Sequence, residues 1–215
     1  LLTVEAMGVD AVVMRHEVEG SAHFAAQVLK PVLINAGDGA HEHPTQGLLD
    51  MFTILQYKQK IEGLKVVIVG DILHSRVARS DIWGMKTLGA DVHVAGPVPL
   101  LAPEMEVMGI TVHSSVEEAI READVINVLR IQKERQGKGL FPSSREYARL
   151  FGINAKRLQL AKPDALLLHP GPMNRGLEIA PDVAYGEQSA IQEQVKNGLA
   201  IRMAILYLVL MGGEE

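Results

Sequence analysis

The chain has 215 residues, of which 47% are hydrophobic and 22% charged, and its formal net charge is −5. That balance is typical of a globular protein with a substantial core, and the acidic excess argues against a nucleic-acid partner, which would need a concentrated basic face. The sequence contains no cysteine, which excludes disulfides and thiolate metal sites and fits a cytoplasmic location.

Short β-branched runs alternate with longer segments of helical period. The first part of the chain predicts strands at 10–14 and 31–35, a helix between them at 20–29, and a second helix at 44–60 whose apolar residues lie on one face. A nearly continuous apolar run at 65–70 then predicts a strand that is buried on both faces, as in a parallel sheet.

The alternation continues toward the C-terminus. Helices are expected at 76–88, at 115–123, from Ser143 onward and at 188–211, and strands at 91–95, 124–129 and 164–169. Ser114 with Glu117, and Ser143 with Glu146, have the spacing of capping boxes at helix starts. Strands regularly separated by helices indicate βαβ units, so the expected fold class is α/β with doubly wound parallel sheets.

The distribution of the strands predicts two domains. Residues 1–58 hold two expected strands and a long final helix, so they are interpreted as the C-terminal part of one domain. Residues 59–187 hold four or five strands and are interpreted as a second domain, followed by a C-terminal helix in 188–215. Leu1 in place of Met, and a helix-like segment at its start, indicate that the sequence begins partway through a larger protein.

No membrane partner is expected. The start of the chain lacks the charged and apolar regions of a signal peptide, and the longest strongly apolar run, from Met203 to Met211, is too short to cross a bilayer. A soluble protein is therefore predicted.

Polar groups follow five of the expected strands. Because ligands of open α/β sheets bind beyond the carboxyl ends of the strands, these groups are candidates for a single site. They are Arg15 and His16, the segment from His43 to Gln46, the segment from Gly70 to Arg76, the segment from Arg130 to Arg135, and the segment from His169 to Pro172. Their side chains and backbone groups suit an anionic or carbonyl-containing ligand.

Each group taken alone has a simpler explanation. Arg15 and Arg76 could be ordinary surface or salt-bridge residues, His43 a satisfied ring at a helix start, and His169 the end of a strand. The turn at Gly70 lacks the G-x-G-x-x-G of dinucleotide sites, and the histidines lack metal-ligand spacing, so neither NAD nor a metal is expected.

Four segments resemble the carbamoyltransferases. His43-Pro44-Thr45-Gln46, with Asp50 four residues later, matches H-P-x-Q-x-x-x-D, which the aspartate and ornithine enzymes share. Three further segments are similar to the aspartate enzymes: Val13 to His16, the R-x-Q-x-E-R segment that begins at Arg130, and the H-P-x-P-x-x-R-x-x-E-I segment that begins at His169. The H-C-L-P and S-M-G motifs of ornithine enzymes are absent.

The resemblance implies transfer of the carbamoyl group of carbamoyl phosphate to the amino group of L-aspartate, giving N-carbamoyl-L-aspartate and phosphate in pyrimidine biosynthesis, with no cofactor. It implies that Arg15 contacts the phosphate and the carbamoyl oxygen. It further implies that His43 donates a hydrogen bond to the carbonyl and that Gln46 binds the carbamoyl amide. The amine of aspartate attacks directly, so no side chain acts as nucleophile.

The remaining implied contacts come from three loops. Gly171 and Pro172, joined by a cis peptide bond, are expected to offer backbone carbonyls to the carbamoyl NH2 group. Arg76 and Arg130 are expected to clamp the two carboxylates of aspartate, with assistance from Gln132.

The family's S-T-R-T-R phosphate loop and a K-G-E-containing loop lent by a neighbouring subunit do not occur in the sequence. They are expected upstream of Leu1, so this fragment alone is expected to be inactive. The resemblance also implies a homotrimer, with a regulatory chain or dihydroorotase as candidate partners.

Two other functions remain open. The first is ornithine or acetylornithine carbamoyl transfer, which amine specificity would distinguish. The second is a catalytically silent homologue that serves as a scaffold or partner subunit, which the sequence upstream would distinguish.

Overall fold

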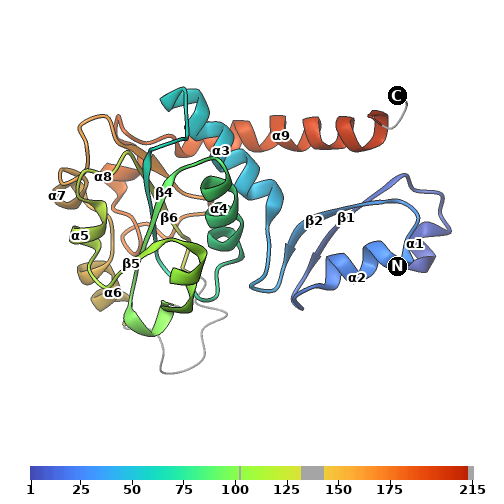
Figure 1. The fold of residues 1–215 in the computed structure, drawn as a ribbon, viewed down its shortest axis with the longest axis horizontal. Helices are drawn as coiled ribbons and strands as arrows, with labels where there is room; N and C mark the ends of the chain where they lie inside the picture. Colours follow the sequence, from blue (N-terminus) through green and yellow to red (C-terminus); the bar gives the residue numbers. More distant parts are fainter. Residues whose placement is uncertain (102, 132–142, 213–215) are drawn as a thin grey trace.

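The computed structural model describes residues 1–101, 103–131 and 143–212, and it has the expected α/β class with parallel sheets. A two-stranded sheet lies in the first part of the chain, where Figure 1 shows it beside the larger unit. The elements of this part are α1 (Leu2–Glu5), β1 (Ala11–His16), α2 (Ser21–Val28), β2 (Val32–Asp38) and α3 (Pro44–Lys58).

A five-stranded sheet follows, with the strand order β5-β4-β3-β6-β7 and parallel pairing throughout. Its strands are β3 (Lys65–Val69), β4 (Asp91–Ala95), β5 (Thr111–His113), β6 (Val125–Val128) and β7 (Leu166–Leu168). The described helices of this part are α4 (Arg76–Thr87), η1 (Val98–Leu100), η2 (Pro103–Met108), α5 (Val116–Ile120), α6 (Ser144–Leu150), α7 (Ala155–Leu158), α8 (Pro181–Ala184) and α9 (Ile191–Met211).

The strand order reverses between β3 and β6. The chain runs outward from β3 through β4 to β5, and then returns to the other side of β3 to form β6 and β7. The loops after β3 and β6 therefore diverge to opposite faces of the sheet and leave a crevice at their carboxyl ends. This is the position where a doubly wound sheet is expected to bind a ligand.

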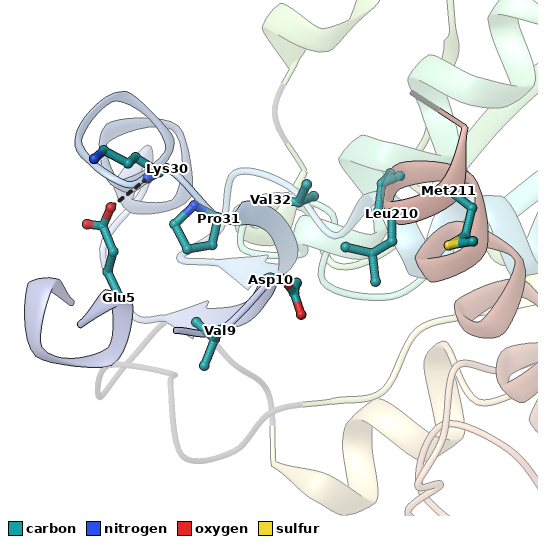
Figure 2. A pocket seen from close by; sticks show the side chains of 9 residues that line it. Glu5, Val9, Asp10, Lys30, Pro31, Val32, Leu210 and Met211 are labelled. Atoms are coloured by element: carbon teal, nitrogen blue, oxygen red, sulfur yellow. Dashed lines mark hydrogen bonds between the residues drawn. The ribbon is translucent and has the colours of Figure 1, made fainter. Parts of the chain in front are cut away.

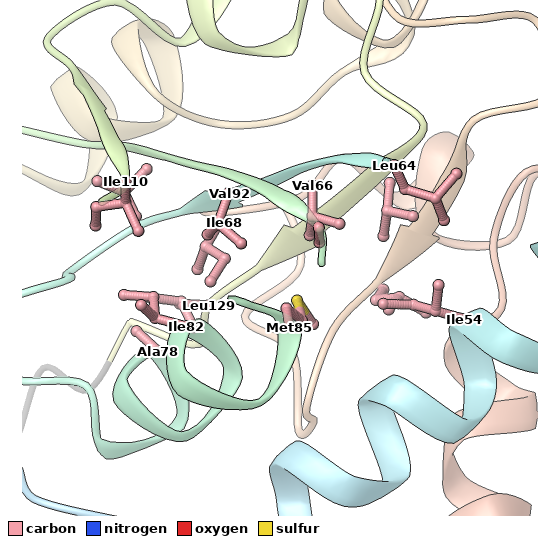
Figure 3. Packing of buried hydrophobic residues seen from close by; sticks show 14 of the residues in the cluster. Ile54, Leu64, Val66, Ile68, Ala78, Ile82, Met85, Val92, Ile110 and Leu129 are labelled. Atoms are coloured by element: carbon pink, nitrogen blue, oxygen red, sulfur yellow. The ribbon is translucent and has the colours of Figure 1, made fainter. Parts of the chain in front are cut away.

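The core forms two layers because successive side chains of a strand point to opposite faces. Along β3, Val66 and Ile68 pack into one hydrophobic cluster, and Val67 and Val69 pack into the other. Helix α4 covers the first face with buried apolar residues that include Ile82, and Figure 3 shows this packing. Helix α5 contributes to the second cluster, so the sheet is covered on both sides as its near-continuous apolar sequence predicts.

Gly70 ends β3 at the point where the crevice begins. Its φ of +147° is a backbone conformation that favours glycine. In addition, a Cβ at this position would lie only 2.8 Å from Cβ of Leu129, which follows β6. The close approach of these two strand ends sets the floor of the crevice.

The expected helix starts are only partly correct. Ser143 caps α6 by accepting a hydrogen bond from the Glu146 amide at 3.2 Å, as its spacing predicts. The cap of α5 is Ser115 and not Ser114, since Ser115 Oγ accepts from the Glu118 amide at 3.3 Å. The prediction was wrong by one residue because two adjacent serines offer the same type of cap.

Helix α9 requires a correction as well. At 21 residues it is, among the described parts of the chain, the one helix long and apolar enough to cross a membrane, whereas the prediction considered only its second half. Its first half is held against α3 by polar side chains: Asn197 Nδ2 donates to Thr53 Oγ1 at 2.9 Å and Gln194 Nε2 donates to Asp50 Oδ1 at 2.8 Å. Figure 1 shows the helix running from α3 past the two-stranded sheet.

Replacement of Ile82 tests the packing of α4. Its side chain is fully buried, so Ile82→Ala should lower the free energy of unfolding by about 2–5 kcal/mol through lost apolar contacts and a residual cavity. The matched control is Trp83→Ala on the same helix, where the side chain is 58% exposed and the change should stay within about 0.5 kcal/mol. Guanidinium unfolding measures both, and equal losses would contradict the packing described.

Candidate active site

A cavity of about 250 Å³ lies at the carboxyl ends of the strands. It is lined, from both sheet units, by every described residue to which the resemblance assigns a contact: Arg15, His43, Gln46, Arg76, Arg130, Gly171 and Pro172. Gln132, the remaining one, lies outside the described residues. Of the other strand-end candidates, His16, His74 and His169 are not in its lining. The strand-end argument therefore gathers candidates from all five strand ends around one cavity, while their individual roles stay predictions.

A larger cavity of about 770 Å³ lies elsewhere, and Figure 2 shows its lining. Asp10 and Pro31, which precede β1 and β2, line it together with Leu210 near the end of α9. The amino ends of parallel strands are opposite to the side where α/β sheets bind ligands. The larger cavity is therefore not the candidate active site, despite its volume.

Arg76 is positioned by the first turn of α4 and is only 2% exposed. Its guanidinium crosses the loop after β2, where Nη1 donates to the Gly39 carbonyl at 3.4 Å. Gly37 has a φ of +115°, and a Cβ there would lie 2.6 Å from Arg76 Nε, so both its backbone conformation and the nearby side chain favour glycine. The arginine thereby joins the two sheet units at the edge of the cavity.

His43 is the N-cap residue of α3, and its backbone N–H donates to Ser80 Oγ on α4 at 2.9 Å. Burial, assisted by the nearby charges of Arg76, Arg202 and Arg15, lowers the pKa of His43 to about 4. The ring is therefore neutral at physiological pH, and it can donate a hydrogen bond from one nitrogen only.

Arg202 was missed by the sequence reasoning. It lines the cavity from α9, and with Arg15, Arg76 and Arg130 it brings the number of arginines there, among the described residues, to four. The sequence does contain an indication of a functional role for Arg202. It is the one charged residue in the apolar second half of a helix, and the long side chain of an arginine there can cover apolar surface while its charged end reaches a polar space. The acidic chain thus concentrates positive charge around one small space, as an anionic ligand requires.

The loop after β7 is fixed by a buried histidine. The backbone N–H of Gly171 donates to His169 Nδ1 at 2.9 Å, so Nε2 of the ring carries the proton and donates to Glu178 Oε1 at 3.1 Å. The Gly171–Pro172 bond is cis, as the resemblance implies. His169 therefore does more than end a strand, which was the favoured interpretation of its sequence context.

The same loop is tied to the segment after β6. Asn174 Nδ2 donates to the carbonyl of Ile131 at 3.0 Å and to Glu178 Oε2 at 3.2 Å. Since Ile131 follows Arg130 directly, the Gly171–Pro172 corner and the Arg130 backbone are held in one hydrogen-bonded unit.

Comparisons with known proteins identify the family. Residues 62–209 match the model of the aspartate/ornithine carbamoyltransferase Asp/Orn binding domain, and residues 1–56 match that of the carbamoyl-P binding domain. The chain belongs to this family. It is 63% identical to the aspartate carbamoyltransferase catalytic subunit of Pelotomaculum thermopropionicum over 98% of its own length and 68% of the relative's.

Solved structures of carbamoyltransferases have the same fold. Aspartate transcarbamoylase from Trypanosoma cruzi, in complex with phosphate, aligns with a TM-score of 0.81 at 28% identity, over 95% of this chain and 69% of that one. Ornithine carbamoyltransferase from Pyrococcus furiosus aligns with a TM-score of 0.83 at 30% identity, over 99% and 70%. The fold alone thus does not separate the two specificities, whereas the sequence identity places this carbamoyltransferase chain with the aspartate catalytic subunits.

The lowered pKa of His43 leads to a prediction for the free enzyme. Its ring should titrate near pH 4 and not near the ordinary value of 6.5. Between these values the unfolded chain binds the proton more readily than the folded one, so His43 should make the protein less stable as the pH falls. Proton NMR titration measures this, with His43→Gln to assign the signal, and titration near 6.5 would contradict it.

Proposed function

We propose that this chain forms the catalytic part of an enzyme that transfers the carbamoyl group from carbamoyl phosphate to the amino group of L-aspartate. The products are N-carbamoyl-L-aspartate and phosphate, as in pyrimidine biosynthesis. The observation that carries the proposal is that four arginines and a neutral histidine line one small cavity in a chain 63% identical to an aspartate carbamoyltransferase catalytic subunit.

The carbamoyl phosphate side of the reaction is assigned to Arg15, His43 and Gln46. When the amine attacks, negative charge develops on the carbonyl oxygen, and fixed donors directed at that oxygen lower the barrier, by about 2.7–4 kcal/mol for each. A neutral His43 suits this role because it donates without having to lose a proton first. The carbonyls of Gly171 and Pro172 are the proposed acceptors for the carbamoyl NH2 group.

The aspartate side is assigned to Arg76, at the start of α4, and to Arg130, which follows β6. Guanidinium groups pair with carboxylates through two parallel hydrogen bonds, so two arginines can orient a dicarboxylate. Because the substrate amine is itself the nucleophile, much of the acceleration comes from positioning, about 7–11 kcal/mol in favourable systems. Gln132 is proposed to assist Arg130.

The complexes of a relative support these substrates. The Trypanosoma cruzi enzyme has been solved with carbamoyl phosphate and with aspartate and phosphate. The alternative of a catalytically silent scaffold gains no support from the comparisons, whose curated relatives are named catalytic subunits.

We further propose a cytoplasmic homotrimer, with a regulatory chain or dihydroorotase as candidate partners. The proposed division is a carbamoyl phosphate-binding part at 1–58, an aspartate-binding domain at 59–187, and a C-terminal helix at 188–215 that returns to the first part. Cavities lined jointly by α9 and the two-stranded sheet support that return.

Two replacements in the full-length enzyme should separate the roles. Arg130→Ala should raise KM for aspartate far more than KM for carbamoyl phosphate, because it removes a carboxylate partner. His43→Ala should mainly lower kcat, by about 10²–10³, because its hydrogen bond strengthens as the oxyanion forms. Steady-state kinetics with each substrate varied measures both, and equal effects of the two changes on carbamoyl phosphate binding would exclude this division.

Assembly gives a second test. The full-length protein should sediment at about three times the mass of one subunit, because the family shares its active sites between neighbours. Analytical ultracentrifugation combined with an activity assay measures this, and a fully active monomer would refute the trimer.

A further inference from the structure

A chain of hydrogen bonds behind the cavity fixes the direction of one side-chain amide. It begins at the backbone N–H of His169, which donates to Gln194 Oε1 at 2.8 Å. A backbone N–H can only donate, so the amide oxygen of Gln194 must face it and the NH2 group must face the other way. Gln194 Nε2 accordingly donates to Asp50 Oδ1 at 2.8 Å.

Asp50 Oδ1 receives a second donor. Gln46 Nε2 donates to the same oxygen at 2.9 Å, from one helical turn earlier on α3. Because the NH2 group of Gln46 is turned inward toward Asp50, its amide oxygen Oε1 remains for the cavity that Gln46 lines. Two glutamines from different helices are thus oriented by one fully buried carboxyl group.

The other oxygen of Asp50 explains why this carboxyl can stay buried. Asp50 Oδ2 and Asp81 Oδ1 are both buried without a hydrogen-bond partner among the described residues, and the Asp50 carboxyl is near enough to raise the pKa of Asp81. Asp81 Oδ2 accepts from Asn127 Nδ2 at 2.8 Å. A proton shared between the two acids satisfies both inward oxygens and removes the repulsion of two buried charges.

The charged and titratable surroundings agree with a shared proton. Burial raises the pKa of Asp50 to about 7, against the lowering influence of Gln194, Gln46, Asn127 and the more distant Arg202. Burial and the Asp50 carboxyl hold the pKa of Asp81 well above its usual range. Asp50 Oδ1 therefore remains an acceptor whichever of the two acids holds the proton.

We propose that Asp50 is a positioning residue that turns the Gln46 amide so that its carbonyl oxygen faces the ligand, and thereby selects a ligand with an NH2 group at that point. The inference rests on the proposed function, in which that ligand is carbamoyl phosphate. Gly171 and Pro172 also line the cavity, and Pro172 has no backbone N–H to donate. This side of the cavity is therefore rich in hydrogen-bond acceptors. An NH2 group satisfies such acceptors, whereas a methyl group of similar size leaves them unpaired.

A purely structural role would need no carboxyl group. A leucine has nearly the same shape as an aspartate and would fill the space without the desolvation cost of a buried acid. It would offer no acceptor to Gln46, however, and the freed amide could then turn its NH2 group toward the ligand's own NH2 group. If Asp50 no longer accepts a hydrogen bond from Gln46, the specific consequence is therefore a weaker preference for a ligand with an NH2 group.

The test compares carbamoyl phosphate with acetyl phosphate, which carries a methyl group in place of NH2, as ligands of the full-length enzyme. The dissociation constants of the two, measured by equilibrium titration, give the preference for NH2. Asp50→Leu should reduce this preference by about tenfold or more, the equivalent of a hydrogen bond lost at a buried polar group. Asp50→Asn should retain it, because the amide oxygen still accepts from both glutamines and the amide NH2 replaces the shared proton toward Asp81.

An unchanged preference in Asp50→Leu, or an equal loss in Asp50→Asn, would overturn the positioning role. If Asp50→Leu does not unfold cooperatively, the double variant Asp50→Ala with Asp81→Ala takes its place, since it leaves no lone buried charge and carries the same expectation. Failure of the proposed function would be seen separately, as a wild-type enzyme that forms no N-carbamoyl-L-aspartate.

Discussion

Mutual repulsion among cations is the constraint that the rest of this site depends on. Four guanidinium groups cannot gather around a cavity of about 250 Å³ unless the scaffold holds each one from a separate direction. Arg15 comes from β1, Arg76 from the start of α4, Arg130 from the end of β6 and Arg202 from α9. Rigid elements on both sheet units thus hold the charges in place, and the repulsion that remains favours entry of an anion.

The same charges add to the effect of burial on a neighbouring histidine. His43 lies among three of the arginines in a largely buried position, so its pKa falls and its ring stays neutral. A protonated histidine would add another positive charge to the cluster, which the nearby arginines oppose. The arginines thus keep the ring neutral, the form in which the proposed function uses it as a hydrogen-bond donor.

Polar contacts also join α3 to the first half of α9. Asn197 and Gln194 bond to Thr53 and Asp50 through buried side chains, and each bond tolerates only one alignment of the helices. Misalignment of the helices would leave these buried polar groups without partners, a cost that apolar side chains do not add. The polar contacts fix the register of α9, and with it the position of Arg202 about two turns later.

Much of the fold was predictable from the sequence because the central strands carry nearly continuous apolar runs. Strands β3 and β4 were placed within a residue of their ends, since burial on both faces leaves few alternative interpretations. The three-residue strand β5 was missed, because a short segment with intermediate and exposed residues lacks that signal. Short α7 and α8 were missed for the same reason, as four residues span little more than one helical turn.

The candidate site was predictable to a different degree. Strand order could not be read from the sequence, yet the rule that ligands lie beyond the carboxyl ends of parallel strands holds for any order, so Arg15, Arg76 and Arg130 were found together. Arg202 obeys no such rule. It reaches the cavity only because α9 packs on α3 in one register, and that register depends on contacts between residues 144 positions apart.

His169 marks the limit of such reasoning most clearly. Its sequence context, a polar residue after an apolar strand, favours a simple strand end over a buried structural role. The decision comes from partners that sequence spacing does not reveal: a backbone N–H two residues later and the carboxylate of Glu178. Both ring nitrogens are thereby occupied, and the ring holds the loop that carries Gly171. Among the described histidines, His43 lines the cavity, whereas His169 holds the loop after β7 in place.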